Sequence, residues 1–372
     1  MNQARSYGKG LLPAPQRAAL LAGLKFRPFL PAHGEIPQVQ PPLIVLMRTQ
    51  HMTPEQLRHL LVCNPRDAVR WIIAAAQAGF SAAQVVLGQL LLDGRGVDRD
   101  AVQAFAWFEA AAEAGDPEAR NMIGRCHEQG WGVPQDPYLA AQAFEGAARQ
   151  GHVWGQVNFA QMLMRAGDPA DRPRCFEMFR AAAEGGTSKP HLKAMNSLAR
   201  FLEEGWGGAP DPASAAVWYL KAATLGDHWA QYNLATILYG RGDEAAAGQW
   251  LQRAVAIGDN GFRRRIAPLL LACPAPALRR HGLDALQRCA LSDLPDDLYA
   301  YALALHEGVA GVRDLQKAQA LFKRAADQGY VQALQDGAFF SAMPRGTSRF
   351  LCLARCCLAL TRFLKTSHGK TS

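Results

Sequence analysis

The chain has 372 residues, of which 49% are apolar but only 9% aromatic, and alanine supplies much of the apolar content. This composition favours closely packed helices over sheets, whereas length alone does not give the number of domains, because the units of a repeat array pack only on their neighbours. The net charge of +8 is concentrated at the ends: residues 1–51 carry +5 and residues 340–372 carry +6, which leaves −3 for the body. A body without a basic excess excludes nucleic-acid binding by this part of the chain.

Residues 1–51 are rich in proline and lack periodicity, so we expect a disordered basic extension, with Met47 and Met52 as alternative start positions. The apolar stretch Ala18–Leu24 is short and has no cleavage pattern after it, and no apolar run reaches the ~18 residues of a membrane span. The cysteines are scattered rather than paired within repeat units, which predicts reduced, buried thiols and a cytoplasmic protein. The thiols concerned are Cys63, Cys126, Cys175, Cys273 and Cys289.

From residue 52 to residue 340 the chain repeats an ending in which a small pair is followed two residues later by glycine. The first copies are Ala75–Gly79, Ala111–Gly115 and Ala147–Gly151. Counting weaker copies, repeats end near residues 79, 115, 151, 186, 226, 258, 293 and 329, at intervals of 32 to 40 residues. A large apolar residue stands three positions before most of these pairs, namely Phe108, Phe144, Phe179, Tyr219, Leu251 and Phe322. The period predicts about eight repeats.

Each period predicts a helix hairpin. Residues 83–92 form a first helix, two glycines in the turn 93–97 supply positive φ, and Asp100 caps a second helix over residues 101–114 that ends at Gly115. A small residue recurs on the first helices, where a larger one would push neighbouring helices apart: Gly88, Gly124, Ala160, Ala199, Ala235 and Ala302. Before the first full repeat, Thr53 and Pro54 begin a capping hairpin whose partner helix starts at Pro65.

Three repeats depart from this pattern. The third loses its turn glycines over residues 166–169, the fifth is shortened around residues 240–242, and the sixth contains Pro268, Pro274 and Pro276. Because proline removes a helix hydrogen bond, we expect irregular curvature over residues 260–295.

The small residue, the glycine-bracketed turn, the aromatic pairs Trp107-Phe108 and Trp218-Tyr219 and the Ala-Ala-x-x-Gly ending together resemble the bacterial Sel-one-like repeat, over roughly residues 53–340. The resemblance implies an all-α, right-handed α/α superhelical solenoid of the tetratricopeptide-like kind. It also implies that the first helices line a concave groove used for partners.

No catalytic or ligating pattern has the spacing its chemistry needs. The tail sequence Gly369-Lys370-Thr371 lacks the first glycine and the preceding strand of a phosphate loop, and the acids around the turn 93–97 do not recur as a calcium loop would require. The spacing of four tail residues is not that of a zinc site: Cys352, Cys356, Cys357 and His368. We therefore predict no catalytic residue, no cofactor and no metal, and a protein that is not an enzyme.

The basic segment 341–372 is predicted to be a tail or a capping helix. Arg355, Arg362 and Lys365 fall near one helical face among apolar residues, which leaves contact with an anionic membrane surface open, although we do not predict it. The other interpretation is a helix that covers the end of the array, or a disordered tail.

A binding site is expected among polar residues of the first helices that the repeat does not need. Asparagine is mildly unfavourable in helices, so its recurrence indicates use, for instance in hydrogen bonding a peptide backbone. The candidates are Asn121, Asn158, Gln161, Asn196 and Asn233. Trp131 and Trp206 occupy equivalent turns and either brace the hairpin or anchor a partner, and we favour bracing.

These residues predict a non-catalytic, regulatory scaffold or adaptor whose groove binds a partner protein or peptide. Two alternatives stay open. One is an enzyme or small-molecule binder of the β-lactam-hydrolysing type that the resemblance links to cysteine-rich relatives, and the other is an assembly subunit of an envelope or secretion machine. Neither the partner's identity nor the oligomeric state follows from the sequence.

Overall fold

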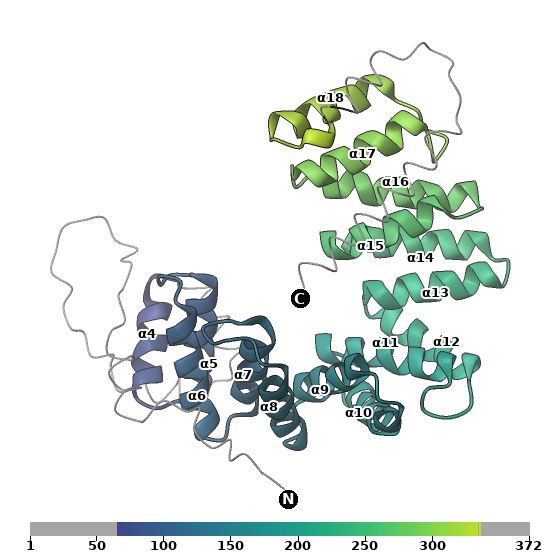
Figure 1. Cartoon of the computed structure of the whole chain (residues 1–372). Helices are drawn as coiled ribbons and strands as arrows, with labels where there is room; N and C mark the ends of the chain where they lie inside the picture. The colour runs from purple at the N-terminus through teal and green to yellow at the C-terminus, as the bar shows by residue number, and fades with distance from the viewer. Residues whose placement is uncertain (1–64, 334, 336–372) are drawn as a thin grey trace, which may run out of the picture. The chain divides into compact units, whose positions relative to one another are not determined.

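The computed structural model describes residues 65–333 and residue 335, and within them every regular element is helical (Figure 1). The predictions made for Thr53, Pro54, Cys63, the 1–51 extension and the 341–372 tail lie outside the described residues. The described part divides into two compact units, one up to Gly185 and one from Gly186 onward.

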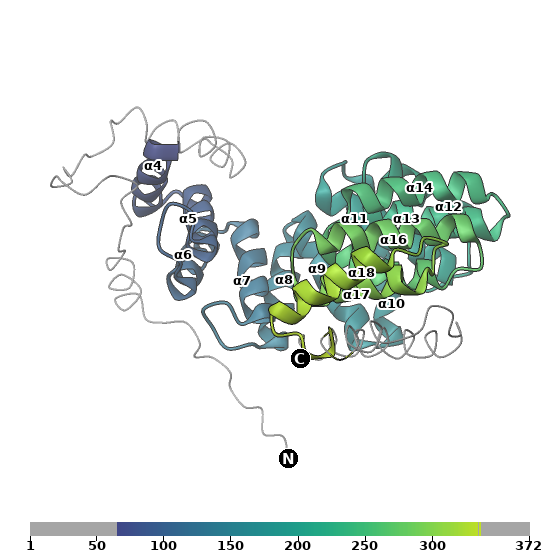
Figure 2. The ribbon, with the colours of Figure 1, turned by 90° about the horizontal axis from the view of Figure 1, so that it is seen from above.

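The first unit is a series of helix hairpins that follow one another in chain order (Figure 2). Its elements are α4 (Pro65–Gln77), α5 (Ser81–Asp93), α6 (Ala101–Glu113), α7 (Pro117–Gln129), α8 (Pro137–Arg149), α9 (Val153–Ala166), the 3-10 turn η1 (Pro169–Asp171) and α10 (Arg172–Glu184). Helix α4, for which the sequence predicts a start at Pro65, is described from that residue onward.

The second unit continues the same plan, and Figure 1 shows its hairpins stacked one on the next. Its elements are α11 (Lys189–Glu204), α12 (Pro212–Thr224), α13 (His228–Gly240), α14 (Glu244–Ile257), α15 (Asn260–Leu271), α16 (Pro276–Ala290), α17 (Pro295–Glu307) and α18 (Leu315–Asp327). The predicted all-α array of hairpins is confirmed.

Local signals determine where the helices begin and end. The carboxylate of Asp100 accepts a hydrogen bond from the backbone N–H of Gln103 at 2.9 Å, which confirms it as the N-cap of α6. Gly94 and Gly96 in the hairpin turn have φ of 68° and 74°, and Gly115 after α6 has φ of 91°. These are left-handed conformations that residues with a Cβ rarely adopt, which explains the glycine pattern.

The small residues of the first helices allow close approach by the second helices. A Cβ on Gly88 would lie 2.5 Å from Cε1 of Phe108, and one on Gly124 would lie 2.6 Å from Cδ1 of Phe144. Both phenylalanines are completely buried. The predicted reason for these small residues is therefore confirmed at both glycines: the ring of the second helix occupies the space that a side chain would need.

The ends of two weaker repeats have backbone conformations or residues that differ from those at the other repeat ends. Asp293 adopts φ of 57°, so an aspartate takes the left-handed conformation that glycine has at most other repeat ends. Gly258 instead has an extended backbone, with φ of −61°. It is small because the Phe262 ring packs on it, and a Cβ would lie 2.2 Å from Cδ1 of that ring.

The predicted departures are visible in the backbone. In the third repeat Gly167 still ends α9 in a left-handed conformation, and η1 replaces the missing turn. In the sixth repeat Pro268 lies inside α15, whereas Pro276 is the first residue of α16, where proline is favourable. The prolines therefore modify this hairpin without abolishing either helix.

Candidate binding surface

The predicted asparagines meet in pairs between neighbouring first helices. Nδ2 of Asn158 in α9 donates to Oδ1 of Asn121 in α7 at 2.9 Å. In the second unit Nδ2 of Asn233 in α13 donates to Oδ1 of Asn196 in α11, also at 2.9 Å. The partners of each pair are 37 residues apart, so the same inter-repeat contact is made once in each unit.

The four amides differ in exposure. Asn121 is buried, with 4% of its surface exposed, whereas Asn158, Asn196 and Asn233 are half-buried. The remaining candidate, Gln161, is half-buried on α9 three residues after Asn158. The asparagine pairs therefore connect adjacent repeats, and three of their four amides also reach the surface. This pairing is invisible in the sequence except as a separation of one repeat length.

The two turn tryptophans each carry an arginine on one ring face. Cζ of Arg125 lies 4.8 Å from the centroid of Trp131, and Cζ of Arg200 lies 5.1 Å from that of Trp206. Both indoles are half-buried, and Phe201 meets Trp206 edge to face at 5.3 Å. In each case arginine and tryptophan are six residues apart, so an exposed arginine of the first helix covers the indole of the turn that follows.

A pocket of about 270 Å³ opens between the first helices α5 and α7. Two of its residues are arginines that the sequence analysis did not single out, Arg99 from the hairpin turn and Arg125 from α7. The others are Gln89, Leu92, Asp93, Met122 and Trp131. The arginines are 26 positions apart, and only the hairpin packing brings them to one pocket, so no motif predicts it.

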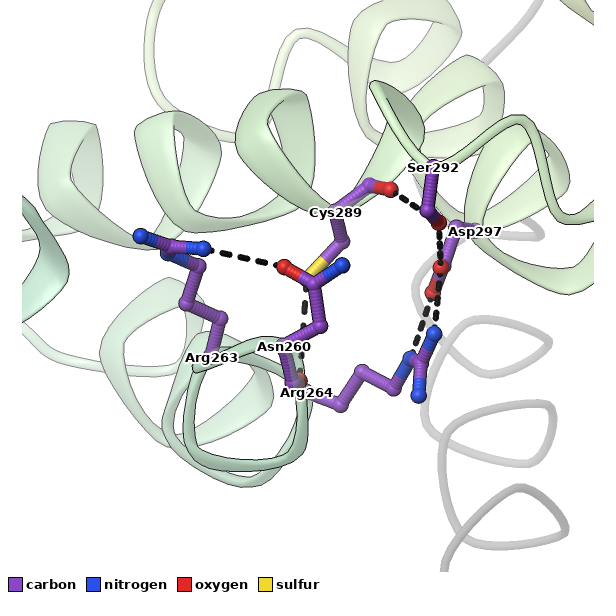
Figure 3. Close-up of polar contacts among 6 residues, drawn as sticks. All are labelled: Asn260, Arg263, Arg264, Cys289, Ser292 and Asp297. Atoms are coloured by element: carbon purple, nitrogen blue, oxygen red, sulfur yellow. Dashed lines mark hydrogen bonds and ion pairs between the residues drawn. The ribbon is translucent and has the colours of Figure 1, made fainter. Parts of the chain in front are cut away.

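The second unit contains a buried polar cluster that sequence reasoning also missed (Figure 3). Arg264 of α15 donates from Nε to Oδ1 of Asp297 in α17 at 2.8 Å and from Nη2 to Oδ2 at 2.6 Å. Oγ of Ser292 is 2.9 Å from the same Oδ2. The side chain of Asp297 is only 3% exposed and that of Arg264 30%. The one signal for it is a pair of opposite charges one repeat apart.

Burial raises the pKa values of three cysteine thiols in the core and so makes them less reactive. Burial raises the pKa of the Cys126 thiol to about 12 and the pKa values of Cys175 and Cys289 to about 11. These three thiols are buried and free, as predicted, whereas Cys273 is free but only partly buried. A thiol with a raised pKa is a poor nucleophile and a poor metal ligand at neutral pH.

Burial also lowers the pKa of His127 below its ordinary value, with the backbone at Pro134 and the charge of Asp136 acting in the opposite direction. Its ring meets Phe105 edge to face at 5.4 Å. Over residues 65–333 and 335, no group of three or more His, Cys, Asp or Glu side chains is arranged to hold a metal ion. None of the described helices is long and apolar enough to cross a membrane.

The hairpin array and its surface of first helices define a class, the α-solenoids built from tetratricopeptide-like repeats. The Sel1 repeat model matches residues 81–116, 117–152, 160–187, 192–227, 230–259 and 295–330. These matches cover more than half of the chain, which therefore belongs to the Sel1 repeat family. The proline-containing hairpin α15–α16 lies between the last two matched ranges and is not matched itself.

Three solved structures are similar to this chain, and the first of them supports the fold. The chain is similar to a Sel1 repeat protein from Oxalobacter formigenes, with 23% identity over 63% of this chain and 99% of that one and a TM-score of 0.50. It is also similar to c5321, a protective antigen of uropathogenic Escherichia coli with an SLR fold (24% identity, 75% and 69% covered, TM-score 0.31). A third is a putative Sel1 repeat protein from Klebsiella pneumoniae (20% identity, 54% and 98% covered, TM-score 0.39).

A search among curated proteins found no match. Sel1 repeat proteins are generally non-catalytic scaffolds for protein–protein interaction.

Proposed function

We propose that this protein is a regulatory adaptor of the cytoplasm that holds a segment of a partner protein along its first helices. The observation that carries the proposal is the pair of inter-repeat amide contacts, Asn121 with Asn158 and Asn196 with Asn233. They present the same chemistry at corresponding places in both units, as a surface that reads a repeating ligand requires.

The chemistry of a paired amide suits a peptide backbone. A side-chain amide offers two N–H donors and one carbonyl with two lone pairs, and the contact between two asparagines uses one donor and one lone pair. The contact also holds each amide in one orientation, which lowers the entropy lost when a ligand binds. The half-buried Asn158, Asn196 and Asn233 are the members that a peptide can reach.

The two alternatives from the sequence receive different support. A hydrolase needs an activated nucleophile, and a cysteine nucleophile is activated by a lowered pKa. Burial instead raises the pKa values of the thiols of Cys126, Cys175 and Cys289. An assembly subunit of an envelope or secretion machine would use the same surface and differs only in its partner. The free cysteines of the described residues agree with a reducing compartment such as the cytoplasm.

The test is affinity capture of partners by the full chain from its own cells, followed by mass spectrometry. The test variant is Asn158→Ala/Asn233→Ala, which changes one reachable amide in each unit. The matched control is Gln142→Ala/Gln249→Ala, which removes two exposed amides from the second helices α8 and α14. Circular dichroism establishes that both variants keep the helical fold.

A protein that is captured by the wild type and the control but lost from the folded test variant supports binding along the first helices. Equal capture by all three chains contradicts it.

A further inference from the structure

The pocket between α5 and α7 combines an apolar and aromatic wall with positive charge. Leu92, Met122 and Trp131 supply the wall, and the guanidinium groups of Arg99 and Arg125 stand beside it. Met122 is buried, with 4% exposure, whereas Arg99 and Arg125 are exposed. The pocket therefore combines a partly apolar wall with two exposed cations.

Both arginines are available to a ligand. Among the described residues, neither Arg99 nor Arg125 forms a salt bridge, whereas the acid of the pocket, Asp93, is paired with Arg95 at 3.0 Å. Arg125 lies over the Trp131 ring at 4.8 Å, and its Nη1 makes a weak 4.0 Å contact with Sδ of Met122. Because the guanidinium N–H groups lie in the plane of that group, a guanidinium stacked on an indole keeps its edge free for a carboxylate.

The size and openness of the pocket suit side chains of a bound segment. At about 270 Å³ and open to solvent, it has room for one or two side chains.

We propose that the pocket binds an internal acidic residue together with the apolar residue beside it, in a partner segment that runs along the first helices. This inference rests on the proposed function, and it states which chemical groups of the partner the first unit of this chain would bind. An internal residue fits better than a chain end, because helix α7 contributes both to the pocket and to the amide contact with the half-buried Asn158, so a segment held by that amide continues past the pocket. Residues 340–372 contain no acidic residue, so this end of the chain cannot supply the occupant.

The experiment follows the indole N–H resonance of Trp131 in the full, ¹⁵N-labelled chain, assigned among the eight tryptophans by the Trp131→Phe variant. The probe is acetyl-Gly-Glu-Leu-Gly-amide, and the neutral comparison is acetyl-Gly-Gln-Leu-Gly-amide. N-acetyl-leucine represents a chain end. We expect a saturable shift with the acidic peptide and an affinity about tenfold lower for the neutral peptide, because the charge-assisted hydrogen bonds are lost.

Arg125→Met and Arg99→Met should each weaken binding of the acidic peptide by about tenfold. The matched control is Arg180→Met, which removes the same charge from an exposed position on α10 and should leave the affinity unchanged.

Equal affinity for the acidic and neutral peptides, equal loss in Arg180→Met, or no shift up to about 10 mM peptide overturns the proposal. Tighter binding of N-acetyl-leucine than of the acidic peptide overturns the internal position. Failure here is distinguishable from failure of the proposed function: a partner lost from Asn158→Ala/Asn233→Ala alongside an unresponsive Trp131 refutes the pocket ligand alone.

Discussion

Removal of the Asp297 carboxylate should destabilise the second unit more than removal of an exposed surface charge. The carboxylate accepts both hydrogen bonds of the Arg264 fork, at 2.8 and 2.6 Å, and lies 2.9 Å from the Ser292 hydroxyl. It also stands in the first turn of α17, where the helix dipole favours a negative charge. In Asp297→Ala all of these interactions are lost and Arg264 keeps a charge without its partner.

Breaking a buried ion pair by removing one member costs about 3–5 kcal/mol. The Arg264 side chain is 30% exposed and regains some hydration, so we expect about 2–4 kcal/mol. For a unit of this size, 1 kcal/mol corresponds to about 2–4 °C in Tm, so a loss of 3 kcal/mol lowers Tm by about 6–12 °C.

The assay is urea and thermal unfolding of the full chain followed by circular dichroism. The control, Asp284→Ala, breaks the exposed pair with Arg288 in α16, in which both side chains are 39% exposed, and should cost less than about 1 kcal/mol. The double variant Arg264→Met/Asp297→Leu removes both charges and should recover much of the loss. If Asp297→Ala costs no more than Asp284→Ala, the buried pair does not stabilise the unit as argued.

Three further predictions concern stability. Asp293→Gly should change the free energy of unfolding by less than about 1 kcal/mol in urea titrations, because relief of the left-handed φ of 57° offsets the loss of the exposed pair with Arg324, and a larger change contradicts this. Gly132→Ala should cost about 3 kcal/mol or more, because φ is 74° and a Cβ would lie 2.1 Å from the carbonyl oxygen of Ala101, and a near-native Tm would refute it. Burial lowers the pKa of His127, so at mildly acidic pH the folded chain binds fewer protons than the unfolded chain. The contribution of neutral His127 to the free energy of unfolding is therefore complete above about pH 6.5 and is lost as the pH falls toward the folded pKa. His127→Gln should therefore reduce the drop in urea midpoint between pH 7.5 and 5, and an unchanged drop would count against it.

Much of the fold could be predicted because its signals are local. The aspartate caps, the left-handed glycines and the small residue opposite each large ring act within one hairpin, so Asp100, Gly115 and Gly124 are readable one at a time. The sequence also predicts weaker repeat ends near residues 258 and 293, and helices α14 and α16 end at Ile257 and Ala290. It does not predict the conformations there, which are an extended backbone at Gly258 beside the Phe262 ring and a left-handed one at Asp293.

The sequence predicts some residues of the candidate surface but not the contacts between them. Residue type alone selected Asn121, Asn158, Asn196 and Asn233, but their pairing depends on how neighbouring first helices pack. The pocket arginines were missed because exposed arginines are common and their separation along the chain carries no motif.

The sequence by itself determined the class of protein, because a period of about 36 residues and its turn and cap residues specify a helix hairpin without reference to anything distant. Only the tertiary structure decided which side chains of successive hairpins meet. Arg264 and Asp297 illustrate the reason: they are 33 residues apart, and their bidentate contact exists because stacking brings α15 beside the start of α17. Contacts between repeats arise from packing geometry, which local sequence does not encode.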